Sequence, residues 1–186
     1  MAEAQNRIYN LAYNNAIEQN TLEAYNGLIQ RYPNHPKKEE IQNKIEDANF
    51  LDLFSGSGAI GLEALSRGAK KTIFCDSSKQ AIEIINKNIK KTHLEDNSKV
   101  YNLDYKKALK EIKEKQDLIY IDPPYKTDFA IQAINEIIKL NIIDENSIII
   151  VETDDKEIIE NIEKLDIEIQ DERKYGRAYL IFLSKR

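Results

Sequence analysis

Residues 50–61 read Phe-Leu-Asp-Leu-Phe-Ser-Gly-Ser-Gly-Ala-Ile-Gly, and a helical apolar pattern follows them directly. This stretch predicts a buried strand, a glycine turn and a helix. Gly56, Gly58 and Gly61 have the G-x-G-x-x-G spacing of a backbone that turns tightly, approaches a ligand closely and packs its helix against its strand. A side chain introduced at Gly58 is expected to meet that ligand. The stretch predicts a nucleotide-type site, and a purely structural turn is the alternative.

The composition is that of one globular domain with a small appended element. The chain has 186 residues, of which 41% are hydrophobic and 32% charged. No apolar run approaches the roughly 18 residues that span a bilayer, and the N-terminus lacks the pattern of a secretory signal. We therefore expect a monomer in the cytoplasm that does not enter a membrane. The net charge of -5 argues against strong non-specific attraction to nucleic acid but permits a local basic face.

Cysteine and histidine suggest no special chemistry. The single cysteine, Cys75, cannot form an internal disulfide, and its place in an apolar run predicts a buried structural thiol. His35 stands between two prolines and is expected to be a solvated turn residue. We predict no metal site.

Residues 1–48 differ in pattern from the rest of the chain. Apolar residues recur at helical spacing over residues 8–17 and 22–29, and Tyr32-Pro33 ends the second run before a third helix. The segment resembles a single tetratricopeptide-like helical repeat. One such unit cannot bury its own apolar face. It is expected either to cap the neighbouring domain or to bind a protein partner.

From residue 49 to residue 186, short apolar runs alternate with helical patterns. Strands are expected from Phe50 and at residues 71–75, 100–103, 117–121 and 147–151, with two more around the Gly176 turn. This alternation predicts an α/β fold with a doubly wound, mostly parallel sheet, and the closing tight turn predicts an antiparallel last strand. The chain therefore divides into a helical segment, 1–48, and an α/β domain, 49–186.

Acidic residues end the predicted strands, where ligands bind in open α/β sheets. Asp76 follows the glycine loop at about 20 residues, the distance at which an acid can bind ribose hydroxyls. For Asp76 and Asp104 a helix N-cap is the alternative. Asp52, between Leu51 and Leu53, needs a partner such as a ligand ammonium group or loop amides.

The fourth predicted strand ends in Asp122-Pro123-Pro124-Tyr125. Two prolines make a rigid backbone without amide donors, so the Asp122 carboxylate and the Pro123 carbonyl can face outward as fixed acceptors. Two acceptors that hold the hydrogens of an exocyclic base amine stabilise the positive charge that grows as the amine attacks a methyl group. Tyr125 can stack on the base. The alternative is a turn that merely ends the strand.

Residues 50–69, the Asp122–Tyr125 motif and the closing Lys174-Tyr175-Gly176-Arg177 closely resemble the bacterial small-subunit (16S) ribosomal RNA guanine-N2 methyltransferases. The resemblance covers residues 50–186. It implies the seven-stranded, Rossmann-like class I methyltransferase fold, S-adenosylmethionine as cofactor, and ribosomal RNA or a small-subunit assembly intermediate as partner. It also implies a set of cofactor-binding residues: Asp52, Ser55, Gly56 and Gly58 at the methionine and ribose, Asp76 at the ribose and Asp104 near the adenine. The implied catalytic residues, which hold the target base, are Asp122, Pro123 and Tyr125.

The front of the chain departs from this family. Its members open with a basic hairpin and an Arg-Pro-Thr segment that contribute to RNA binding, and residues 1–48 stand in their place. A natural fusion, a truncated paralogue and an artificial join near Asn49 all fit. The remaining candidates for phosphate contacts are Lys87, Lys90, Lys91, Lys106, Lys107 and Arg177.

Guanine N2 of 16S ribosomal RNA is the predicted target. A non-catalytic cofactor-binding or protein-interaction module that works through the N-terminal helices is one alternative, and an adenine-N6 nucleic-acid methyltransferase is another. For the glycine loop alone, a nicotinamide cofactor is the alternative ligand.

Overall fold

The computed structural model describes residues 45–124, 126–175 and 177–186, except the side chain of Tyr175. Residues Lys44–Arg186 form one compact unit. Residues 1–44 of the predicted helical repeat (1–48) and the role of Tyr125 therefore fall outside the described residues, and the domain boundary at residue 49 stays a prediction. None of the helices in the described ranges has the length and apolar character to cross a membrane.

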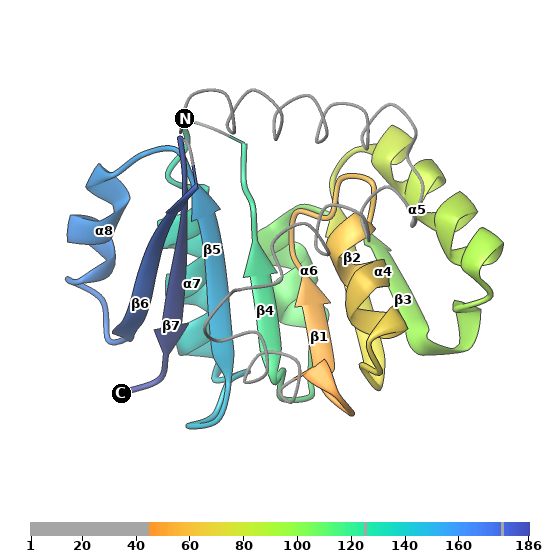
Figure 1. The fold of residues 1–186 in the computed structure, drawn as a ribbon, viewed down its shortest axis with the longest axis horizontal. Coiled ribbons are helices and arrows are strands. Elements are labelled where there is room, and N and C mark those ends of the chain that lie inside the picture. Colours follow the sequence, from red (N-terminus) through yellow and green to blue (C-terminus); the bar gives the residue numbers. More distant parts are fainter. Residues whose placement is uncertain (1–44, 125, 176) are drawn as a thin grey trace, which may run out of the picture. The chain divides into compact units, whose positions relative to one another are not determined.

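Strands and helices alternate along the described chain, as the sequence pattern predicts (Figure 1). The elements are β1 (Asn49–Asp52), α4 (Ala59–Ser66), β2 (Lys71–Asp76), α5 (Lys79–Thr92), the 3-10 helix η1 (Glu95–Asn97), β3 (Ser98–Asn102), α6 (Tyr105–Glu111), β4 (Leu118–Ile121), α7 (Phe129–Leu140), β5 (Ile148–Thr153), α8 (Glu157–Ile162), β6 (Glu168–Tyr175) and β7 (Ala178–Ser184). The predicted α/β fold is confirmed.

The strands form one seven-stranded sheet in the order β3-β2-β1-β4-β5-β7-β6. The pairs from β3 to β5 are parallel, whereas β7 is antiparallel to both β5 and β6. The prediction of an antiparallel last strand is confirmed. Strand order reverses between β1 and β4, and this switch point is where open α/β sheets bind ligands.

One face of the sheet carries a continuous apolar row. Strand register aligns Leu183, Ile149, Ile119, Leu51 and Ile73 across five neighbouring strands. These side chains are at most 3% exposed and belong to one core with the apolar sides of α6 and α7. The helices α4 and α5 pack against β1, β2 and β3. Both faces of β1 and β2 are therefore buried, which explains their largely apolar sequences, whereas β3 at the sheet edge has no buried residue.

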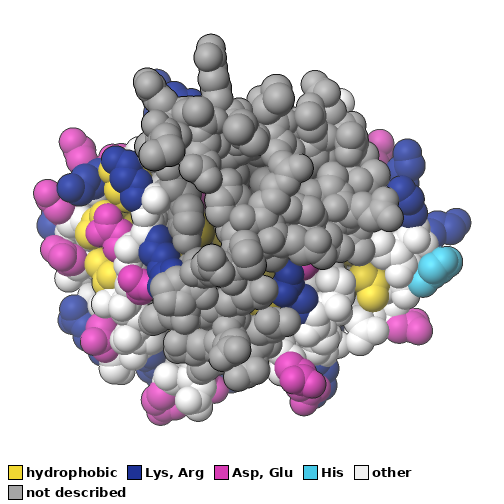
Figure 2. Space-filling model, viewed as in Figure 1, with side chains coloured by type: hydrophobic (Ala, Val, Ile, Leu, Met, Phe, Trp, Pro, Cys, Tyr) yellow, Lys and Arg dark blue, Asp and Glu magenta, His cyan; other side chains and the backbone are white. Residues whose placement is uncertain are grey.

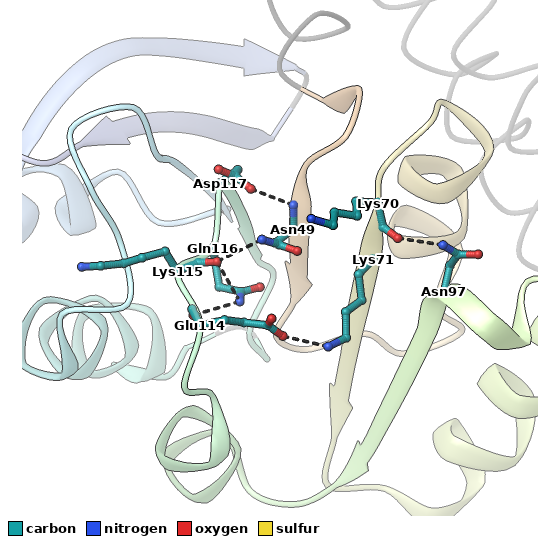
Figure 3. A network of polar contacts seen from close by, with 8 residues as sticks. All are labelled: Asn49, Lys70, Lys71, Asn97, Glu114, Lys115, Gln116 and Asp117. Carbon is teal, nitrogen blue, oxygen red and sulfur yellow. Dashed lines mark hydrogen bonds and ion pairs between the residues drawn. The ribbon is translucent and has the colours of Figure 1, made fainter.

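Polar contacts connect the amino ends of β1, β2 and β4 to the residues around them (Figure 3). The Asn49 amide donates to Asp117 Oδ2 at 2.7 Å, and the Asp117 amide donates back to the Asn49 carbonyl at 3.0 Å. Lys71 Nζ pairs with Glu114 Oε1 at 2.8 Å. The Asn97 side chain donates to the Lys70 carbonyl at 2.7 Å. The polar groups of this edge thus bind one another, so the opposite edge is the candidate for ligand chemistry.

The helix α4 lies unusually close to the sheet at Gly61. A Cβ atom at Gly61 would come within 2.3 Å of Phe74 Cε1 and 2.8 Å of Thr72 Cγ2 on β2. Only glycine fits at this position, and it therefore sets the distance between α4 and β2. The third glycine of the loop is a packing residue.

Gly61→Ala is expected to lower the free energy of unfolding by about 1–3 kcal/mol, because the added methyl group overlaps the Phe74 ring. In a helix without this contact, alanine in place of glycine would stabilise the fold by about 1 kcal/mol. Helix propensity and overlap with Phe74 therefore predict opposite signs for the change in unfolding free energy. Urea unfolding measures the change. The same substitution in a Phe74→Leu background should be less harmful. A Gly61→Ala protein as stable as the wild type would contradict the packing argument.

Candidate active site

Four parallel strands bring acidic side chains to their shared carboxyl edge. Asp52 and Asp76 end β1 and β2, Asp122 follows β4, and Glu152 lies one residue before the end of β5. Register pairs Asp52 with Tyr120 on the neighbouring strand, two residues before Asp122. The structure thus brings together two segments that are far apart in sequence: the glycine loop, residues 55–58, and the Asp122 turn, the residues from Asp122 that follow β4.

Ser55 holds the glycine loop against β2. Its hydroxyl donates to the Asp52 carbonyl at 2.6 Å, and it accepts the Cys75 amide at 2.9 Å. Its own amide donates to the Cys75 carbonyl at 3.0 Å. Ser55 is 8% exposed, so both its side chain and its backbone stabilise the loop. Cys75 itself is buried, as predicted, and burial raises the pKa of its thiol to about 12.

The loop glycines face different surroundings. Gly56 and Gly58 have φ values of +53° and +77°, which favour glycine. Among the described residues, no atom lies within 4 Å of a Cβ placed at Gly56. A Cβ at Gly58 would meet Ile85 Cγ1 at 3.1 Å and the Phe74 ring at 3.4 Å. A side chain at Gly58 would thus enter the packing between α5 and β2. The expectation that it would also meet a ligand stays a prediction.

Asp52 caps the helix that follows the loop. Its Oδ2 accepts the Gly61 amide at 3.0 Å, while Gly58, at the N-cap position, makes no side-chain hydrogen bond. The first amides of a helix need such an acceptor. Burial raises the pKa of Asp52 from 3.8 to about 7 against the lowering effect of this bond, and the charges of Asp122 and Asp76 add to the rise. The loop amide is thus one of the two partners expected for Asp52.

Asp76 links two loops. Its Oδ2 accepts the Gly56 amide at 2.9 Å and its Oδ1 accepts the Ser78 amide at 2.8 Å. Each carboxylate oxygen keeps a second lone pair, so Asp76 can also accept from a hydroxyl group. Asp104 has the geometry of the alternative interpretation, because it is the N-cap of α6 and accepts the Lys106 amide at 3.0 Å.

The Asp122 turn combines a half-buried acid with two different prolines. Pro123 is buried and Pro124 is exposed. The Pro124 carbonyl accepts the Thr127 hydroxyl at 2.7 Å, which fixes the chain just past Tyr125. Burial, followed by the charge of Glu152, raises the pKa of Asp122 from 3.8 to about 7.

Sequence reasoning missed an aromatic cluster beside these loops. The ring centroid of Phe54 lies 5.2 Å from that of Tyr105 and 6.5 Å from that of Phe129, and Tyr105 lies 5.3 Å from Phe129. The Tyr105 hydroxyl donates to Gln132 Oε1 at 2.9 Å. All three rings stand next to predicted strand or helix ends, and that shared position is the signal that could have found them. The cluster joins the ends of β1 and β3 to the start of α7.

Sequence reasoning also missed Glu152 and Tyr120. The Tyr120 hydroxyl donates to Glu152 Oε2. Burial, followed by the Glu152 charge, raises the pKa of the Tyr120 hydroxyl well above 10, so it stays a donor at neutral pH. The carboxyl ends of β1, β2, β4 and β5 therefore carry Asp52, Asp76, Asp122 and Glu152, and these acids favour a ligand with positive charge. No group of three or more His, Cys, Asp or Glu side chains placed to hold a metal ion occurs in the described residues.

Known proteins are similar to this chain over most of its length. Residues 39–184 match the family described as "Conserved hypothetical protein 95". The chain is 31% identical over 174 residues to "Putative rRNA methyltransferase YlbH" of Bacillus subtilis (strain 168), which covers 89% of this chain and 94% of that protein. It is 37% identical over 109 residues to "Ribosomal RNA small subunit methyltransferase D" of Buchnera aphidicola subsp. Baizongia pistaciae (strain Bp), which covers 59% of this chain but only 55% of that protein.

Solved structures share the fold. The "putative methylase HI0767" from Haemophilus influenzae superposes with a TM-score of 0.68 at 27% identity, over 79% of this chain and 92% of that chain. A structure titled "SMU.776, a putative methyltransferase complexed with SAH" gives a TM-score of 0.63 at 19% identity, over 81% of this chain and 50% of that one. The second likeness shows the fold alone.

Asp52→Asn is expected to flatten the pH dependence of stability. Because the folded-state pKa of Asp52, about 7, lies above its unfolded value, the ionised carboxylate destabilises the fold increasingly as the pH rises toward 7. Asparagine cannot ionise. Relative to the wild type, the variant should therefore gain about 2–3 kcal/mol between about pH 5 and about pH 8. Urea unfolding at both pH values measures this gain, with Asp154→Asn, an exposed acid, as control. Parallel pH profiles for Asp52→Asn and the wild type would contradict the burial of a charged carboxylate.

Proposed function

We propose, because the chain belongs to the family described as "Conserved hypothetical protein 95", that it transfers a methyl group from S-adenosylmethionine to ribosomal RNA. The observation that carries the proposal is the pairing of β1 with β4, which places the glycine loop and the Asp122 turn side by side. A cofactor loop next to a pair of acceptors for an amine is the arrangement that such a transfer requires. The names of the relatives support ribosomal RNA as the substrate class.

The residues at the sheet edge fit this cofactor. S-adenosylmethionine carries two positive charges, on its sulfonium and its ammonium group, and the acids at the strand ends favour both. No atom of the described residues would meet a Cβ at Gly56, so this part of the loop leaves room for the cofactor to approach. When bound, the cofactor supplies the electrophilic methyl group. A nicotinamide cofactor fits less well, because the Asp122 turn has no task in hydride transfer.

The predicted cofactor residues have distinct roles in this proposal. Asp52 holds the loop and faces the ammonium group, and Asp76 accepts the ribose hydroxyls. The amides of Ser55 and Gly58 already donate within the fold, so these two residues shape the loop. The proposed place of Asp104, near the adenine, is the one that the family resemblance implies, and its position just after β3 agrees with it.

The Asp122 turn is the proposed site of the target base. The Asp122 carboxylate and the Pro123 carbonyl accept the two hydrogens of the amine, because the Pro124 carbonyl is already occupied by Thr127. Tyr125 is the proposed stacking surface. A base must leave its stack to reach such a site, so looped or partly assembled RNA should be a better substrate than a duplex. We propose guanine N2 of 16S ribosomal RNA as the target.

The candidate phosphate-contacting residues differ in the edge of the sheet at which they lie. Lys106 and Lys107 lie exposed in the first turn of α6, at the same sheet edge as the site. Arg177 lies in the turn between β6 and β7, also at that edge. Lys90 and Lys91 end α5 at the opposite edge. In Figure 2 the coloured surface mixes basic and acidic side chains, so contacts beside the site matter more than overall charge.

Full-length protein is expected to bind S-adenosylmethionine and S-adenosylhomocysteine in a calorimetric titration. Asp76→Ala should weaken binding about tenfold or more, because it removes the ribose acceptor and the bond that holds Gly56. Asp154→Ala, which removes an exposed acid, is the matched control. Absence of heat with both ligands would contradict the cofactor, and NADH should then be tested.

Asp122→Ala is expected to lower methyl transfer about a hundredfold or more while cofactor affinity changes little, because the acceptor acts mainly in the transition state. Tritiated methyl transfer to ribosomal subunits that lack the modification, followed by nucleoside analysis, measures both rate and product. Label in N2-methylguanine supports the proposal. Label in N6-methyladenine would change the target, and no label with Asp122 intact would favour a non-catalytic binding module.

A further inference from the structure

Glu152 lies beside the proposed target-base site but belongs to neither sequence motif. Parallel pairing aligns Tyr120 with Ile150 and Ile121 with Val151, so the next residues on the two strands are Asp122 and Glu152. Side chains of aligned residues on neighbouring parallel strands point to the same face. The two carboxyl groups are therefore neighbours at the sheet edge, and the charge of Glu152 acts on Asp122.

Tyr120 keeps Glu152 in this position. It lies two residues before Asp122 on β4, so its side chain shares the same face, and its hydroxyl donates to Glu152 Oε2. A carboxylate held by a half-buried tyrosine cannot swing into solvent without losing this bond. The negative charge next to Asp122 is thus fixed by the fold.

We propose that Glu152 is a positioning residue whose fixed negative charge makes the Asp122 carboxylate the acceptor of the proton that the target amine loses. This inference rests on the proposed function. As the amine nitrogen bonds to the methyl carbon, the carbon–sulfur bond breaks and its electron pair stays on sulfur. The nitrogen then carries a positive charge and one proton too many. That proton passes to an Asp122 oxygen, the nitrogen keeps the electron pair of the broken N–H bond, and Asp122 later releases the proton to solvent.

The charges around Asp122 favour this role. Burial and then the Glu152 charge raise the pKa of Asp122 to about 7, and Asp52 on β1 is a further acid that interacts with it. Tyr120, on the same strand, stays neutral. Relative to an ordinary carboxylate, a rise of about three pH units strengthens proton affinity about a thousandfold. Asp122 then matches the working pH, as an efficient proton acceptor should.

The first test reads the carboxyl group directly, without cofactor or RNA. Full-length protein with 13C-labelled aspartate side chains is titrated by NMR, and Asp122→Asn and Asp52→Asn assign the two signals with high midpoints. In Glu152→Gln the Asp122 midpoint should fall by about one pH unit while staying above its ordinary value, because burial remains. Glu152→Asp, which keeps the charge, should restore most of the midpoint. Glu160→Gln, an exposed acid on α8, should change nothing. An Asp122 midpoint that does not move in Glu152→Gln overturns the proposal.

The second test reads the reaction. Wild-type methyl transfer should rise with pH through about 7, as Asp122 ionises. In Glu152→Gln this rise should occur about one pH unit lower, with a maximum rate about threefold lower, because the acceptor is a weaker base. Should Glu152→Gln fail to fold, Tyr120→Phe tests the effect of Glu152 on Asp122 by removing the bond that holds Glu152. In Tyr120→Phe the Asp122 midpoint should fall by less than the fall expected for Glu152→Gln. A pH profile of transfer unchanged in Glu152→Gln, together with a shifted Asp122 titration, overturns the proton role. Wild-type protein that binds cofactor but transfers no methyl group contradicts the proposed function instead, and the NMR titration separates the two failures.

Discussion

The hydrogen bond from the Gly61 amide to the buried carboxylate of Asp52 is the contact on which the site depends. Asp52 is the last residue of β1, and its side chain also caps α4. Gly58, at the N-cap position of α4, has no side chain that could accept a helix amide. The same bond holds Gly61 where α4 can approach Phe74, and the loop between them must then turn through Gly56 and Gly58 with positive φ. A carboxylate that is 2% exposed thus fixes helix, loop and strand relative to one another.

Burial of this acid has an electrostatic consequence for the whole sheet edge. Asp52, Asp122 and Glu152 come from three adjacent parallel strands, so none of them can move away without disrupting the sheet. Burial raises the pKa values of Asp52 and Asp122 most, and neighbouring negative charges add to the rise, which is why both values reach about 7. The amino edge differs, since there Asn49, Asp117 and Lys71 bind groups of the protein itself. The sheet therefore concentrates unbalanced charge at one edge only.

The sequence predicted what depends on local pattern. Alternating apolar runs placed the strands, and Asp76 and Asp122 were correctly expected at strand ends, because a buried parallel strand must stop where polar residues begin. What depends on register or on neighbours distant in sequence was not predictable. The surroundings of Gly58 depend on Ile85 and Phe74, so its packing role was not predictable from the loop pattern. Glu152 lies at the site only because β5 pairs with β4. The rings of Phe54, Tyr105 and Phe129 come together only because the ends of three separate elements meet. For Asp104 the sequence left open a ligand-binding acid or a helix N-cap, and its bond to the Lys106 amide shows that it is an N-cap.

An acidic site on an acidic protein raises the question of how RNA, itself a polyanion, could approach. The formal charges overstate the repulsion, because carboxyl groups with pKa values of about 7 carry only part of their charge at neutral pH. On the proposed function, the cofactor adds positive charge at the same edge and offsets much of the remainder. The lysines of the first turn of α6 can then act on phosphates only at short range, because salt screens charges beyond about 8–10 Å. Local arrangement of charge, rather than the net value of -5, therefore decides whether a phosphate backbone can lie beside this site.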